Sequence, residues 1–408
     1  MSLRVEQDCP QCSGPLEMDE TDRLLRCSFC SVQSFLGNTG PLHFILPRRQ
    51  PDPYTIYAPY LRFKGTIYSC LSSRIEQRLV DISTRGVKLS FLPPSLGLRP
   101  QAMKMRFATP GFSGSFLRKS IDEAGILKRA AKNLHVRDET VLHQALVGYA
   151  LNIIYLPLSI KDEEILDGVV EKALFQIPEG ATPFAEAEID TQAWKPFFLS
   201  ALCPRCGWNL EGESKSVVLL CANCNSGWQA GGRNFSAVRI KVTPSTNRDA
   251  IFLPFWNYRV AAKGIRLNSF ADFIRITNQA LVIQPEWEEM DLYFASPAFK
   301  IRPPDFLRLA TQVTLGRRFA LQITDSLPTK NLHPVTLGHS DAERGLKVIL
   351  AHSAVSRASV FACLPDIQLE VAEYFLHYLP FDKTSHELRQ THLGVTLNQR
   401  ILNYGRSL

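Results

Sequence analysis

Eight cysteines in two identically spaced quartets constrain this 408-residue chain more than any other feature. Two Cys-x-x-Cys pairs, separated by fourteen residues, form the first quartet of Cys9, Cys12, Cys27 and Cys30. The second quartet repeats this spacing 194 residues further on, at Cys203, Cys206, Cys221 and Cys224. Because each Cys-x-x-Cys turn places two thiolates in one tight loop, two such turns can complete a tetrahedral shell around a metal ion. The pattern therefore predicts two structural zinc ions, one for each quartet.

Four thiolates leave no coordination position for water or a substrate, so the expected role of each metal is structural and not catalytic. A segment of about 35 residues cannot bury a core of its own, and metal binding would contribute roughly 10–16 kcal/mol to its folding. We expect both cysteine regions to unfold without metal.

Iron and redox chemistry are the alternatives to zinc. Rubredoxin-type iron sites usually have glycine after the second cysteine of each pair, whereas the residues here are Ser13, Ser31, Gly207 and Asn225. A thioredoxin-like redox site needs one Cys-x-x-Cys pair near a βαβ unit, not two matched quartets. Both comparisons favour zinc.

Sequence similarity between the two halves continues beyond the cysteines. Three further segments recur in the same order, at offsets that grow from 195 to 203 to 223: 56–64 with 251–259, 94–100 with 297–303, and 155–158 with 378–381. Repeats of this kind indicate an internally duplicated chain with insertions in its second half.

The expected fold class is α+β, mainly β, because short aromatic and β-branched segments bounded by prolines outnumber helical patterns. We expect strands at 43–46 and 56–64, and helices near 120–134, 138–150 and 340–350. The expected domains are a zinc ribbon at 1–40, a β-rich module at 41–180, a linker at 181–200, a second ribbon at 201–232 and a second module at 233–408. Trp208, Trp228 and Trp256 are expected to pack in the core.

At residues 8–35 and 202–228 the chain resembles the zinc-ribbon family, in which two cysteine turns hold the metal between β-hairpins. The tandem arrangement is similar to uncharacterised bacterial zinc-ribbon proteins of unknown function. The resemblance implies the metal but no activity, because zinc ribbons serve transcription, translation, protein assembly and enzymes alike.

Enzyme motifs are missing from the sequence: it has no His-Glu-x-x-His, Gly-x-Ser-x-Gly, Walker or dinucleotide-binding pattern. No apolar run reaches the length of a transmembrane helix, and residues 1–10 do not read as a secretory signal. We therefore expect a cytoplasmic protein that is not an enzyme. The remaining cysteines, Cys70 and Cys363, are expected to be small buried apolar residues.

The net charge of +7 is uneven, because residues 47–119 contain thirteen Lys or Arg and only three acids. Such a basic block can attract nucleic acid, an acidic protein or anionic lipid. The candidate anion-binding residues are Arg48, Arg49, Arg62, Lys64, Arg99 and Arg302. Arg99 and Arg302 occupy equivalent places in the repeat, where a structural salt bridge is the favoured alternative.

Three functional hypotheses follow. The leading one is a non-enzymatic zinc-binding scaffold or adaptor, whose duplicated halves bind an unidentified protein partner. The alternative is a nucleic-acid-binding protein that uses the basic 47–119 block. A redox or metal-handling enzyme is the third.

Overall fold

The computed structural model describes residues 3–37, 40–50, 52–109, 111–121, 125–126, 139–190, 194–317, 322–356 and 360–405. The chain forms two compact units. Unit 1 comprises Met1–Lys64, Val80–His135 and Ala150–Ser200, and unit 2 comprises Gly65–Leu79, Val136–Tyr149 and Ala201–Leu408. Each unit thus contains one cysteine quartet, but two segments expected in the first half, 65–79 and 136–149, belong to unit 2. None of the helices in the described ranges is both long and apolar enough to cross a membrane.

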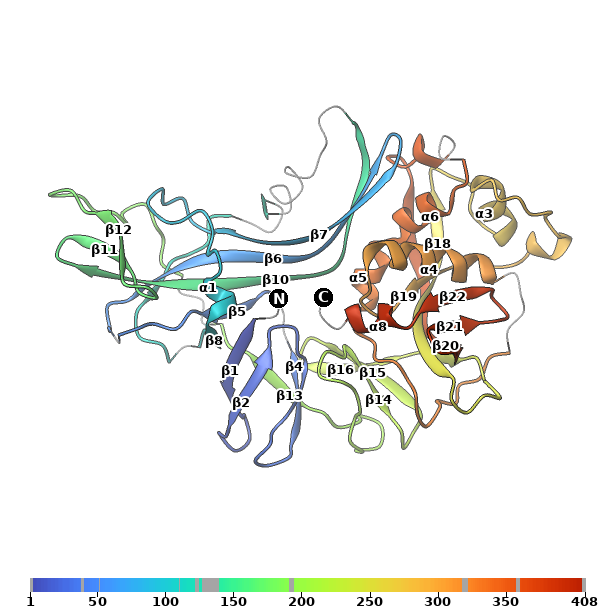
Figure 1. Ribbon diagram of the computed structural model, residues 1–408, viewed down its shortest axis with the longest axis horizontal. Helices are drawn as coiled ribbons and strands as arrows, with labels where there is room; N and C mark the ends of the chain where they lie inside the picture. Colours follow the sequence, from blue (N-terminus) through green and yellow to red (C-terminus); the bar gives the residue numbers. More distant parts are fainter. Residues whose placement is uncertain are drawn as a thin grey trace. The chain divides into compact units, whose positions relative to one another are not determined.

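A sheet of ten strands dominates the first half of the chain (Figure 1). Its main path runs β12 (Lys172–Gln176), β11 (Glu164–Asp167), β10 (Val141–Lys161), β5 (Leu42–Ile45), β8 (Lys104–Phe107), β1 (Arg4–Asp8) and β2 (Pro15–Asp19). Off this path, β6 (Ile56–Leu71) pairs with β10, β7 (Ile75–Arg85) and β9 (Ser115–Phe116). The short helix α1 (Arg99–Ala102) precedes β8. Nearly every residue of β6 from Tyr57 to Leu71 is buried, which fits its many apolar and aromatic residues. The buried residues also include the charged Arg62.

Unit 2 is built around a second, six-stranded sheet. Its order is β19 (Tyr293–Pro297), β18 (Ile251–Lys263), β20 (Gln368–Lys383), β21 (Glu387–Gln390) and β22 (Val395–Asn398), with β17 (Ile240–Val242) also on β20. The same unit contains the helices α3 (Phe270–Ile276), η1 (Pro285–Trp287), α4 (Pro303–Gly316), α5 (His339–Glu343), α6 (Leu346–Ser353) and α8 (Arg400–Gly405), of which α4, α5 and α6 contact strands of the sheet. Trp256 of β18 is fully buried and donates from Nε1 to the carbonyl of Leu337 at 2.8 Å. The described residues are therefore mainly β, as expected.

The second Cys-x-x-Cys pair of each quartet lies at a small three-stranded antiparallel sheet, whereas Cys9 and Cys12 lie in the turn between β1 and β2 of the ten-stranded sheet. The first is β3 (Leu24–Arg26), β4 (Gln33–Gly37) and β13 (Phe197–Ser200), and the second is β14 (Val218–Cys221), β15 (Ser226–Gly231) and β16 (Asn234–Val238). Gly37 of β4 pairs with Phe197, and its counterpart Gly231 of β15 pairs with Asn234. The strand β13 thus completes the first sheet in the position that β16 occupies in the second.

The expected linker at 181–200 is wrong over its last residues, because β13 is an integral strand of the first cysteine region. The prolines at 178, 183 and 196 do interrupt regular structure, but the apolar run Phe197–Leu199 that follows them has high β-propensity. A long-range partner, β4, provides the pairing that the local sequence does not reveal.

Some strand pairings within one large sheet recur at corresponding positions within the other. Parallel partners recur as Tyr57 with Phe116 and Phe252 with Leu332, and again as Tyr155 with Ile45 and Tyr378 with Val242. The hairpins β10–β11–β12 and β20–β21–β22 have the same register at an offset of 223, as in Ile160 with Ile165 and Lys383 with Leu388. These pairings have matching registers in the two sheets, although one sheet has ten strands and the other six.

A turn inside these hairpins also recurs. Asp167 accepts bonds from the backbone N–H groups of Val169 and Val170 through Oδ1. Gln390, at the same offset of 223, accepts from His392 and Leu393 through Oε1. The carboxylate of Asp167 and the amide oxygen of Gln390 thus accept the same pair of backbone hydrogen bonds in the two turns.

The helix expected at 138–150 is wrong, since Val141 begins the long strand β10. Its apolar residues fit a helical spacing, but Ala145 and Val147 are buried two residues apart, as in a strand. Pairing with β6 overrides the local pattern. The strands at 43–46 and 56–64 are confirmed by β5 and β6, and the helix near 340–350 appears as α5 and α6. Most of the helix expected at 120–134 lies outside the described residues.

Candidate metal centres

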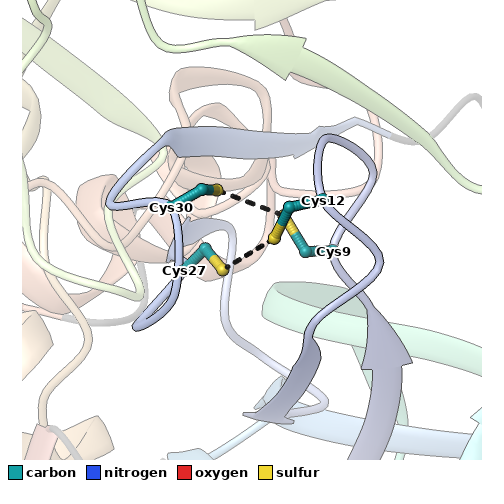
Figure 2. A group of neighbouring side chains, drawn as sticks. All are labelled: Cys9, Cys12, Cys27 and Cys30. Carbon is teal, nitrogen blue, oxygen red and sulfur yellow. Dashed lines mark hydrogen bonds between the residues drawn. The ribbon is translucent and has the colours of Figure 1, made fainter.

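The four thiols of the first quartet point toward one another from two facing loops (Figure 2). Sγ of Cys9 lies 3.8 Å from that of Cys30, and Sγ of Cys12 lies 3.6 Å from that of Cys27. All four sulfur atoms lie within 4.8 Å of one another. Cys9 and Cys27 are buried, Cys30 is half-buried and Cys12 is exposed.

The second quartet has the same geometry. Its sulfur atoms are 3.6 Å apart for Cys203 and Cys224, and 3.5 Å apart for Cys206 and Cys221. The order of burial along the chain, buried, exposed, buried and half-buried, is the same as in the first quartet. The two sites are therefore equivalent in both spacing and exposure.

These distances fit a metal ion and exclude disulfides. A disulfide requires sulfur atoms about 2.05 Å apart. Four sulfurs placed tetrahedrally about 2.3 Å from a zinc ion lie about 3.8 Å from one another, close to the separations of 3.5–3.8 Å found here. Each quartet can therefore hold one metal ion, and a closed set of four thiolates is typical of structural zinc.

The backbone of each loop prepares its sulfur atoms for binding. The residue after the second cysteine of every pair has a left-handed conformation, with φ of 58° at Ser13, 59° at Ser31, 73° at Gly207 and 50° at Asn225. The loops close with hydrogen bonds such as Ser13 N to Cys9 O at 2.9 Å and Gly207 N to Cys203 O at 2.8 Å. Three non-glycine residues thus adopt the conformation that glycine provides, so the glycine criterion does not separate zinc from iron.

Backbone N–H groups aimed at sulfur stabilise thiolates in both sites. The N–H groups of Cys30 and Phe29 lower the pKa of Cys27 to about 6, although burial opposes them. Burial raises the pKa of Cys203, but the N–H groups of Cys206 and Arg205 outweigh it and bring the pKa to about 6. In the second site burial raises the pKa of Cys221 to about 12. Four such thiols can all ionise together only beside a cation, which is what a bound metal supplies.

The second site has a polar support that the first lacks at the equivalent positions. The hydroxyl of Ser226 lies 3.0 Å from Sγ of Cys224 and accepts a hydrogen bond from Nε1 of Trp228 at 2.8 Å. At an offset of 194, the first region has Val32 and Ser34 instead. Groups in contact with metal ligands fix their orientation, so the second site is the better supported of the two.

Arg62, a candidate anion-binding residue, is instead the centre of a buried ion-pair network. It is 4% exposed and donates to both carboxylate oxygens of Asp81, each at 2.9 Å. It also pairs with buried Glu20, whose Oε2 accepts from Nδ2 of Asn152 at 3.1 Å. A guanidinium already satisfied by two carboxylates is not available to an external anion.

Arg99 makes the structural salt bridge that was the favoured alternative, because it lies 2.7 Å from the fully buried carboxylate of Asp167. Its counterpart Arg302 is the exposed N-cap residue of α4. Lys64 lies half-buried on β6. The structure does not bring these three residues together into a single anion site.

Acidic residues of the block itself and of other parts of the chain pair with many basic residues of the 47–119 block. Arg48 pairs with Asp52 at 3.1 Å and Arg49 with Glu171 at 3.5 Å. Including these, eight of its thirteen basic residues form salt bridges, namely Arg48, Arg49, Arg62, Arg74, Arg99, Lys104, Arg106 and Arg118. The block is continuous in sequence but largely compensated in space.

The tryptophans and the isolated cysteines divide between core and surface. Trp228 and Trp256 are buried, as expected, but Trp208 is 56% exposed, so its expected core position is wrong. Phe29 in the first quartet is also exposed, at 67%. Cys70 is fully buried, which raises its pKa to about 12, whereas Cys363 is only partly buried.

No protein-family model, curated protein or solved structure matches this chain. The metal sites therefore rest on their own geometry.

Proposed function

We propose that this protein is a non-enzymatic scaffold or adaptor that binds other proteins through two duplicated halves, each organised by one structural zinc ion. The observation that carries the proposal is the closure of both quartets, because four protein thiolates leave no position for a reacting ligand. Metal that cannot take part in a reaction has a structural use, which is to hold a surface in shape.

The duplication belongs to the same proposal. Its support is the register of the strands. Tyr57 pairs in parallel with Phe116, and Phe252 pairs in parallel with Leu332 at the corresponding place, although the residue types at these positions differ. We infer that each half is a zinc ribbon joined to a β-rich module.

Exposed aromatic side chains on the cysteine loops support a protein-binding role. Phe29 lies between two ligands of the first site, and Trp208 follows Cys206 by two residues in the second. Exposed aromatic residues on a rigid support are typical energetic centres of protein interfaces. Zinc would thus fix the loops that present them.

The first test combines metal analysis with partner capture. We expect two zinc ions per chain in protein purified without added metal, and one after Cys206→Ser. Cross-linking in cells should capture a partner that is lost from the Phe29→Ala/Trp208→Ala variant and retained by Tyr54→Ala, since Tyr54 is 86% exposed but belongs to neither cysteine segment, 9–30 or 203–224. Capture that is indifferent to Phe29 and Trp208, or turnover of a substrate that survives loss of the metal, would contradict the proposal.

Nucleic-acid binding by the 47–119 block is the alternative function. The salt bridges that compensate this block weigh against it. Binding of DNA or RNA that weakens steeply between 50 and 200 mM salt would favour it over the scaffold, on the scale of roughly 10³-fold for six or more phosphate contacts.

A further inference from the structure

A cavity of about 290 Å³ lies beside the second cysteine region in unit 2. Strand β14 lines it through Val218 and Leu220. The segment 327–335, which includes Leu332 and pairs with β14 where Val335 meets Val218, lines it as well. Tyr378 of β20 also lines it, and Glu211 and Glu213 contribute carboxylates. The cavity therefore combines apolar walls with acidic groups.

In unit 1 the corresponding place is occupied by the chain itself. The segment 188–190 adds antiparallel to the edge at 116–118, with Asp190 N donating to Phe116 O and Arg118 N to Glu188 O, both at 2.7 Å. Further along this segment, Trp194 stacks on His43 with ring centroids 5.0 Å apart. His43 in turn contacts the hydroxyl of Tyr155 at 3.2 Å.

The strand pairings make the two places equivalent. Phe116 corresponds to Leu332, since they pair with Tyr57 and Phe252 at matched positions, and Tyr155 corresponds to Tyr378. In unit 1 the Phe116 carbonyl is bound by Asp190, whereas the N–H and C=O of Leu332 make no hydrogen bond within the described part of the chain. At Leu332 unit 2 thus offers open backbone groups where unit 1 has an added segment. This edge ends at Pro334, which has no N–H, and at Val335, which pairs with Val218 of β14.

We propose that this cavity binds an extended peptide segment of a partner protein, which adds to the edge at Leu332 and places a large aromatic side chain beside Tyr378. The inference rests on the scaffold function and names the kind of ligand that one half recognises. Strand addition is a common mode of peptide binding, in which the backbone provides affinity and the pockets provide specificity.

The charge of the residues that line the cavity indicates that the bound peptide segment is basic. In unit 1 Arg118 faces the added strand and pairs with Glu188 at 2.8 Å. The position equivalent to Arg118 in unit 2 is Pro334, and the exposed carboxylates of Glu211 and Glu213 outnumber the single ammonium of Lys330 around the cavity. The polarity is therefore reversed, and a segment that carries lysine or arginine fits it better than an acidic one.

A designed probe can test this directly. The probe is a fluorescein-labelled peptide with the sequence of residues 185–195, in which Glu186, Glu188 and Asp190 are replaced by lysine. A second peptide is N-methylated at the lysine that replaces Asp190, which removes the N–H expected to reach Leu332 O. Fluorescence anisotropy with the zinc-loaded full-length protein should show binding of the first peptide and binding at least tenfold weaker for the second.

Protein variants locate the binding. Glu211→Lys/Glu213→Lys should weaken the first peptide about tenfold, whereas the matched change Glu286→Lys/Glu289→Lys, at exposed positions outside the cavity, should alter it less than twofold. No binding, or equal binding to the two double variants or of the two peptides, would overturn the inference.

Failure of this inference differs from failure of the scaffold function. If the Glu211→Lys/Glu213→Lys protein captures its cellular partner as well as the unaltered protein does, the cavity is not the binding site but the scaffold function stands. If no partner is captured by any form of the protein, the scaffold function itself fails and the cavity inference fails with it.

Discussion

Replacing Arg62 by methionine should destabilise unit 1 strongly. Arg62 connects Glu20, which lies between β2 and β3, to Asp81 on β7. Glu20 is 2% exposed, so without the guanidinium its carboxylate would be left buried with only Asn152 as a donor among these groups. Asp81 is 34% exposed and can be solvated, so most of the penalty comes from Glu20.

The magnitude follows from breaking a buried ion pair on one side, which costs about 3–5 kcal/mol. Changing Glu20 to glutamine removes the charge that needs compensation. The Glu20→Gln/Arg62→Met double variant should therefore be more stable than Arg62→Met alone. A surface pair is the matched control: Arg49→Met breaks a 3.5 Å contact between exposed groups and should cost under about 0.5 kcal/mol.

Hydrogen exchange with mass spectrometry resolves the two units and suits this test. Peptides from 56–64 should exchange about a hundredfold faster or more in Arg62→Met, since 1.4 kcal/mol is a factor of ten. Peptides from 251–259 act as the internal reference and should not change. Protection of 56–64 that stays within threefold of normal, or a Glu20→Gln change that adds to the damage of Arg62→Met, would refute the role given to this network.

Three further outcomes follow from single groups. Ser31→Gly should raise the stability of the first cysteine region by about 1 kcal/mol, because Ser31 has φ of 59°. The urea concentration at which a chelator removes the metal from this region measures the change. Ser226→Ala should speed metal release from the second site about tenfold in a chromogenic chelator assay, because the hydroxyl supports Cys224. Burial lowers the pKa of His377 to about 3, and its Nε2 lies 2.9 Å from the hydroxyl of Thr243. The unfolded chain therefore binds a proton near pH 6.5 that the folded state does not bind, so this group should lower the stability of unit 2 by about 1 kcal/mol between pH 6.5 and 5.5. His377→Gln should flatten this loss in urea titrations at the two pH values, and an equally steep loss in the variant would exclude His377 as its source.

The metal ligands could be predicted because their information is local. Two residues between paired cysteines fix the loop, and Cys9 through Cys30 lie within one short segment. The same reasoning located strands β5 and β6 from aromatic runs between prolines. In each case the residues that determine the structure are neighbours in sequence.

Features that depend on distant partners could not be predicted in this way. The strand β13 forms because β4 lies beside it, although 160 residues separate Phe197 from Gly37. The N-terminal part of β10 reads as a helix until its pairing with β6 is known. The basic block reads as a binding surface until carboxylates such as Asp167 and Glu171 are placed against it. Charge counted along a sequence window does not reveal which charges meet in space.

The two sheets also show which features of a shared topology can change. Asn257 of β18 matches Arg62 of β6 at the offset of 195, and it is also buried. Its Oδ1 accepts from Nε and Nη2 of Arg317 at 3.1 and 2.7 Å, and the guanidinium lies 4.7 Å from the ring centre of Tyr293. Burial lowers the pKa of Arg317 to about 10.

At one position of the topology, then, the guanidinium comes from the strand in one unit and from the end of a helix in the other. The backbone pairing does not depend on which element provides the guanidinium, because the hydrogen bonds between strands do not involve side chains. The buried polar groups do depend on it, since each buried donor needs an acceptor within hydrogen-bonding distance. We therefore expect Arg62→Asn, which copies the residue of unit 2 without Arg317, to be as damaging as Arg62→Met, because asparagine brings no positive charge to Glu20. The strand registers of the two units can therefore match while their buried polar networks differ. Replacing one network by the other requires all of its residues to change together.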